Sequence, residues 1–156
     1  VVAGEDRVCY GAQLRNTSYK KMMLEKLNLD LNRIHFVGGL PFDEYVNLLR
    51  ISSAHVYLTY PFVASWSLLD AMSCECPIIA SNTEPVREFI EDGNNGILFD
   101  FYNIQEQVSK IEYALDNKDK MQPLRKKARK TILENYALKD LLPKHINNIK
   151  RMIRNK

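Results

Sequence analysis

Long apolar runs are missing from this chain of 156 residues. Its longest hydrophobic stretches have the length of a β-strand, so none could cross a bilayer as a helix. A positively charged start followed by an apolar segment is also missing, which argues against a secretory signal. The chain opens instead at Val1-Val2-Ala3-Gly4, within a strand-like pattern and without an initiator Met. We therefore expect a domain truncated at its N-terminal edge.

Cysteine is scarce as well, and the three residues are Cys9, Cys74 and Cys76. Three cysteines cannot form a disulfide framework, and free thiols are typical of the reducing cytosol. No second pair of Cys or His residues lies at zinc-ligand spacing from Cys74 and Cys76. We interpret the cysteines as small apolar side chains and expect a cytoplasmic protein.

The charges are distributed unevenly along the chain. Residues 1–117 hold 9 Lys and Arg against 16 Asp and Glu, whereas residues 118–156 hold 13 against 3. A nucleic-acid-binding surface would not be confined to one tail in this way, so we expect no nucleic-acid partner. The basic C-terminal region is either a solvated helix face or a surface for peripheral contact with the anionic cytoplasmic face of a membrane.

Short apolar runs rich in Val, Ile and Tyr alternate with segments of helical periodicity. The runs cover 1–4, 34–37, 54–60, 77–80 and 96–99, and the helical segments cover 14–27, 43–51, 65–73 and 85–90. Apolar strands that alternate with helices predict a doubly wound α/β fold, in which a parallel sheet is covered on both faces. The pattern predicts one domain over 1–156.

Three helical stripes follow residue 103 and predict additional C-terminal helices of the same domain, packed on or near the sheet. The first stripe consists of Ile104, Val108, Ile111 and Leu115. The last is long and regular, from Leu138 to Ile153, and we expect it to pack on the protein itself.

Open α/β sheets bind ligands where the carboxyl ends of their strands lead into helices, whose unpaired N–H groups suit phosphate. The GxGxxG and GxxxxGK[ST] patterns are missing, and the pair Gly38-Gly39 alone indicates no more than a turn. The segment 60–72 is more informative. Ser65 or Ser67 can cap a helix there, so that the N–H groups of Trp66 and Ser67 face the crevice.

Asp70 lies about one turn into this predicted helix. Its carboxylate either accepts hydrogen bonds from both hydroxyls of a ribose or is a first-turn acid that favours the helix dipole by about 0.3–1 kcal/mol. Trp66 either stacks on a base or sugar or anchors packing at the helix start. The residues alone leave these alternatives open.

The segments LLDAMS (68–73) and CPIIAS (76–81) resemble the pattern L-x-L-E-A-M-A-x-G-x-P-V-I-A of the group 1 glycosyltransferases. The resemblance includes IHFVG (34–38), SAHVYL (53–58), PVRE (85–88) and DGNNGILF (92–99), so it covers almost the whole chain. It implies the C-terminal, Rossmann-like half of a GT-B fold, which binds the nucleotide-diphospho-sugar donor of a retaining transferase. The implied setting is surface or exopolysaccharide biosynthesis.

The resemblance also implies roles for single residues. Asp70 stands at the second family glutamate and would accept from the donor's ribose. The backbone N–H groups of Trp66 and Ser67, with Ser65 before them, would hold the diphosphate and sugar. Gly38 and Gly39 would line the nucleobase side. Glu88 would orient the donor loops, although a solvated helix acid is an equal interpretation.

Several positions depart from the family pattern. The first family glutamate, near the reaction centre, is Phe62, so we assign no catalytic residue. The glycine before the next strand is Glu75, and a Gly-Gly pair is replaced by Glu84-Pro85. The family's donor-binding Arg and Lys would lie before Val1, and its acceptor domain is missing too. We therefore expect this chain alone to be inactive.

The departures also keep two rival functions open. One is a degenerate, non-catalytic GT-B module that binds or scaffolds. The other is a GT-B sugar-nucleotide epimerase. For the transferase we expect no cofactor and no metal, because no Asp-x-Asp is present to hold a metal-bound diphosphate.

Overall fold

A computed structural model describes residues 1–8, 12, 14–59 and 63–154 of the chain. Phe62 and Cys9 therefore lie outside the described residues. The chain divides into two compact units, Val1–Tyr45 and Val46–Lys156. Each unit is described by itself, and helix α2 (Phe42–Ile51) runs across the division.

The first unit contains a short parallel sheet and one helix. Strand β1 (Val2–Ala3) pairs in parallel with β2 (Phe36–Gly38), and α1 (Tyr19–Lys26) lies between them in sequence. The helix predicted over 14–27 begins later because Ser18 caps it. The Ser18 backbone is extended, and its hydroxyl accepts from the amide of Lys21 at 3.1 Å.

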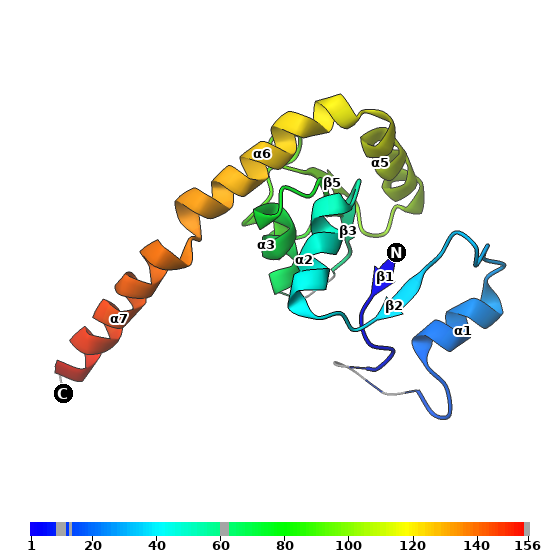
Figure 1. The fold of residues 1–156 in the computed structure, drawn as a ribbon, viewed down its shortest axis with the longest axis horizontal. Coiled ribbons are helices and arrows are strands. Elements are labelled where there is room, and N and C mark those ends of the chain that lie inside the picture. Colours follow the sequence, from blue (N-terminus) through cyan, green and yellow to red (C-terminus); the bar gives the residue numbers. More distant parts are fainter. Residues whose placement is uncertain (9–11, 13, 60–62, 155–156) are drawn as a thin grey trace. The chain divides into compact units, whose positions relative to one another are not determined.

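The second unit contains a three-stranded parallel sheet. Its strands are β3 (His55–Tyr57), β4 (Ile78–Ser81) and β5 (Ile97–Phe99), which pair in that order. Strands β3 and β5 are labelled in Figure 1. The short helices of this unit are α3 (Trp66–Ser73) and α4 (Glu84–Arg87). Alternation and parallel pairing confirm the α/β prediction, while the hydrogen-bonded strands fall into sheets of two and three.

The core of the second unit lies on both faces of β4, which is buried throughout. Successive strand residues point to opposite faces. Ile79 packs with Phe99 and with side chains from two C-terminal helices, Ala114 of α5 (Ile104–Asp116) and Met121 of α6 (Lys118–Asn135). Helix α3 buries Leu68, Ala71 and Met72 and packs against α6.

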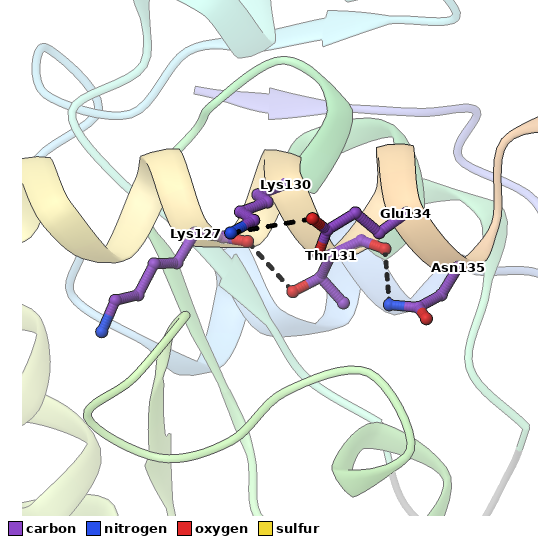
Figure 2. Close-up of polar contacts among 5 residues, drawn as sticks. All are labelled: Lys127, Lys130, Thr131, Glu134 and Asn135. Atoms are coloured by element: carbon purple, nitrogen blue, oxygen red, sulfur yellow. Dashed lines mark hydrogen bonds and ion pairs between the residues drawn. The ribbon is translucent and has the colours of Figure 1, made fainter.

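Helix α6 also fastens the turn that precedes β5. Figure 2 shows Lys127, Thr131 and Asn135 along one side of the helix, where Thr131 Oγ1 donates to the carbonyl of Lys127 at 3.0 Å. The same hydroxyl accepts a hydrogen bond from the side-chain amide nitrogen, Nδ2, of the buried Asn95 at 3.2 Å. Lys127 Nζ donates to Asn94 Oδ1 at 2.7 Å. The basic face of α6 therefore holds part of the core in place.

The expected packing of two C-terminal helices needs correction. In α5, Ile104, Val108 and Leu115 of the predicted stripe are exposed, whereas Ile111 of that stripe is partly buried and packs against the core beside the buried Ala114. Helix α7 (Leu138–Arg154) buries no residue, and Leu138 and Met152 are 72% and 70% exposed. A regular apolar stripe predicts a helix and its face but not what covers that face.

Glu75 occupies a backbone conformation that favours glycine, with φ of 55°. It lies just after α3, at the family's glycine position, and its Oε1 lies 3.7 Å from Arg129 Nε. We expect Glu75→Gly to be more stable than Glu75→Ala by about 1 kcal/mol, because both lose the ion pair and only glycine relieves the left-handed strain. Urea unfolding of the two variants measures the difference. Equal midpoints would show that this backbone conformation is unstrained.

Candidate functional site: the start of helix α3

The site follows the carboxyl end of β3, where the chain enters α3. Ser65 is the N-cap, with an extended backbone (φ −90°, ψ 161°), and its Oγ accepts from the Ser67 amide at 3.2 Å. The two hydroxyls of Ser65 and Ser67 lie 2.6 Å apart and share a hydrogen bond. Of Ser65 and Ser67, which the sequence analysis gave as alternative caps, Ser65 is the N-cap in the structure.

Two buried contacts that the sequence did not reveal hold the turn before α3. The amide of Ser65 donates to the phenolic oxygen of Tyr57 at 2.7 Å. At the end of β4, the fully buried Ser81 hydroxyl accepts from the Thr59 amide at 2.9 Å and donates to the Tyr57 carbonyl at 3.2 Å. A polar residue at the end of an otherwise apolar strand, as in IIAS (78–81), was the signal available in the sequence.

These contacts decide which amides of the first helical turn remain available. The Ser65 amide is bonded to Tyr57, the Ser67 amide to the cap, and the Leu68 amide to the Ser65 carbonyl at 3.1 Å. Within the described part of the chain, the Trp66 amide has no acceptor. Of the two amides expected to face the crevice, the Ser67 amide is occupied by the cap, and the Trp66 amide is the one without an acceptor among the described residues.

Trp66 and Asp70 lie four residues apart and so occupy the same face of α3. The Trp66 side chain is 81% exposed, which excludes a packing role within the described residues of this unit. Asp70 is half-buried, and its charge reaches Cys74 one turn further on. An exposed indole and an acid thus lie on one face of α3, which begins after the carboxyl end of β3.

The remaining predicted site residues are Glu88, Gly38 and Gly39. Glu88 is exposed at the C-terminal end of α4, where its carbonyl accepts from the Tyr136 hydroxyl at 3.4 Å. Burial, reinforced by the Glu88 charge, raises the pKa of Tyr136. Gly38 and Gly39 belong to the first unit. Gly38 has φ of +69°, and a Cβ at Gly39 would lie 2.5 Å from the Glu5 carboxylate.

His55, in β3, is the titratable group of the second unit whose burial matters for stability. Its Nε2 is buried and has no hydrogen-bond partner among the described residues, and burial lowers the pKa of His55. As the pH falls through about 6.5, the unfolded chain binds a proton before the folded one. We expect stability in urea to fall between pH 7.5 and 5.5, and His55→Leu to reduce that difference. An unchanged pH dependence in the variant would show that His55 does not contribute.

Neither a metal centre nor a membrane span emerges from the described residues. No group of three or more His, Cys, Asp or Glu side chains in this part of the chain is arranged to hold a metal ion. None of the helices described here has the length and apolarity needed to cross a bilayer.

The fold is that of the Rossmann-like, donor-binding half of a GT-B protein. The chain belongs to the glycosyl transferases group 1 family, whose profile matches residues 1–131. It is 29% identical over 147 residues to an uncharacterized glycosyltransferase of Methanocaldococcus jannaschii, covering 94% of this chain and 36% of that protein.

Solved structures support the same fold. TarM of Staphylococcus aureus, in complex with UDP, matches with a TM-score of 0.68 and 26% identity, covering 82% of this chain and 25% of that one. HepE of Anabaena, in complex with UDP-glucose, has a TM-score of 0.74 at 18% identity, covering 83% and 35%. The chain thus spans about a third or less of the length of these relatives.

Proposed function

We propose that the start of α3 binds the diphosphate of a nucleotide-diphospho-sugar, the donor for retaining glycosyl transfer. The observation that supports this most directly is the Trp66 amide, which has no acceptor in the described chain and begins a helix at the carboxyl end of a parallel strand. Such an amide, with the helix dipole behind it, stabilises phosphate oxygens. UDP is present in the TarM structure, which is 26% identical to this chain, so UDP is the first nucleotide to test.

The residues around that amide complete the proposed site. Asp70 accepts hydrogen bonds from the ribose hydroxyls, and the exposed Trp66 indole covers the base or the sugar. Ser65 and Tyr57 position the amide through the cap and the 2.7 Å hydrogen bond. Because the sequence has no Asp-x-Asp to hold a metal-bound diphosphate, we propose that donor binding is independent of metal.

Titration of the chain by calorimetry with UDP, GDP and their sugars tests this proposal. We expect saturable binding of one nucleotide in the presence of a chelator and no sugar transfer by the chain itself. Absence of binding to every nucleotide would instead support the degenerate module as the function of this chain.

For the whole protein we propose a cytoplasmic transferase of surface polysaccharide biosynthesis with an acceptor-binding half. The apolar stripe of α7 would pack on that half. In α6, Lys127, Arg129 and Lys130 already contact Asn94, Glu75 and Glu134. The basic residues near the C-terminal end of α7, Lys150, Arg151 and Arg154, are therefore the ones we propose for peripheral contact with anionic lipid. Equal sedimentation with neutral and anionic vesicles would rule out that contact.

A further inference from the structure

A cavity lies at the opposite ends of the strands from the start of α3. Its volume is about 170 Å³, and it is bounded by the end of α2, the residues just before β3 and β4, and the first turns of α6. Pro77, Ala114 and Met121 supply apolar wall. The polar lining consists of Arg50, Ser52, Ser53, Lys118, Gln122 and Arg125. Every described lining residue belongs to the second unit.

The charge of this cavity is all of one sign. Arg50, Lys118 and Arg125 line it, and no Asp or Glu is among the described lining residues. Three cations around one small space repel each other, and this repulsion destabilises the folded protein unless an anion enters. Most surface basic residues avoid such an arrangement by facing water separately.

Arg125 is the most constrained of the three. Its Nε is buried and has no hydrogen-bond partner among the described residues. Its charge also opposes the effect of burial on Cys76, where burial raises the pKa of the thiol to about 11. A buried guanidinium N–H without an acceptor is costly, because the group loses water and gains no partner in return. An acceptor atom that binds in the cavity beside Arg125 could satisfy this donor.

The donors match a tetrahedral oxyanion. Guanidinium groups bind phosphate oxygens bidentately, and an ammonium adds a point charge. Ser53 and Gln122 add neutral hydrogen-bonding groups, whereas the Ser52 hydroxyl is already bonded to the Leu48 carbonyl at 2.6 Å. The volume is below the 300–1,000 Å³ typical of drug-sized ligands, so the cavity suits one phosphate group rather than a nucleotide-sugar.

We propose that this cavity is a binding site for a phosphate-class anion, either inorganic phosphate or the phosphate monoester of a small molecule or lipid headgroup. The bound anion joins the end of α2 and α6 across the start of the sheet. It stabilises the second unit by mass action, because the unfolded chain lacks the assembled site. The site does not depend on the proposed donor function, since it lies at the other ends of the strands.

Thermal unfolding of the chain in inorganic phosphate, against NaCl of matched ionic strength, tests the proposal. At phosphate about 100 times above its dissociation constant we expect Tm to rise by about 5–10 °C. Arg50→Gln and Arg125→Gln should each reduce the affinity at least about tenfold. Lys126→Gln is the matched control, because Lys126 is an exposed neighbour on α6 that does not line the cavity.

The same rise of Tm in all variants, or no rise beyond that in NaCl, would overturn the proposal. If Arg125→Gln does not fold, Arg50→Gln decides, because Arg50 is exposed at the end of α2. Glycerol 3-phosphate in solution and vesicles with phosphatidic acid distinguish a free ligand from a lipid headgroup. Absence of UDP binding by the parent chain would contradict the donor site and not this one, because the two sites lie at opposite ends of the strands.

Discussion

Replacing Trp66 by proline should lower the affinity of the chain for UDP by about 10- to 100-fold. Proline removes the amide that the proposed site depends on, and a hydrogen bond to a charged oxygen contributes about 1.5–3 kcal/mol. The fold should tolerate the change. Trp66 is the first residue of α3, where proline is favoured, and Ser65 before it has the extended backbone (ψ 161°) that a following proline requires.

Trp66→Ala is the control, because it removes the same indole and keeps the amide. Calorimetry on both variants separates the two contributions, and unfolding midpoints close to that of the parent chain show that α3 is intact. We expect the alanine variant to bind UDP clearly more tightly than the proline variant. Equal affinities would mean that the amide contributes nothing and that the indole accounts for any loss.

Much of the second unit could be predicted because local rules and tertiary structure agree there. The apolar run of β4 forms a strand buried throughout, and a serine caps α3 within one residue of the predicted start. Even Glu75, which breaks the family pattern, adopts the positive φ expected of the glycine it replaces. The fold therefore determines the backbone conformation at this position, even though the residue there is a glutamate and not a glycine.

The missed features depend on contacts between distant residues. The bond from the Ser65 amide to the Tyr57 hydroxyl and the bridge from Ser81 to β3 follow from strand order, which periodicity does not reveal. The predicted stripe of α5 included Ile111, which packs against the core, but it missed the buried Ala114, because a single alanine adds little to an apolar periodicity. The basic residues of α6 are also close together in sequence but have different contacts in the fold. Lys127 bonds to a turn residue, Arg129 forms an ion pair, and Arg125 lines the cavity.

Asp70 gives the second large effect that we expect. Asp70→Asn should weaken UDP binding by about 10- to 100-fold, since it replaces a carboxylate that accepts from ribose hydroxyls by a neutral amide of similar shape. With 2′,3′-dideoxy-UDP, which lacks both hydroxyls, the parent chain and the variant should bind equally. Calorimetry with the two nucleotides measures this coupling directly.

Asp70→Glu completes the test, because the family has glutamate at this position. The longer side chain should bind UDP at least as tightly as aspartate does and should remain sensitive to loss of the hydroxyls. The alternative role, a helix acid that favours the dipole, predicts a different outcome. In that case Asp70→Asn would lower stability by at most about 1 kcal/mol and would weaken both nucleotides equally or not at all. Equal losses for UDP and its dideoxy analogue would therefore remove Asp70 from the donor site while leaving the Trp66 amide as a phosphate ligand.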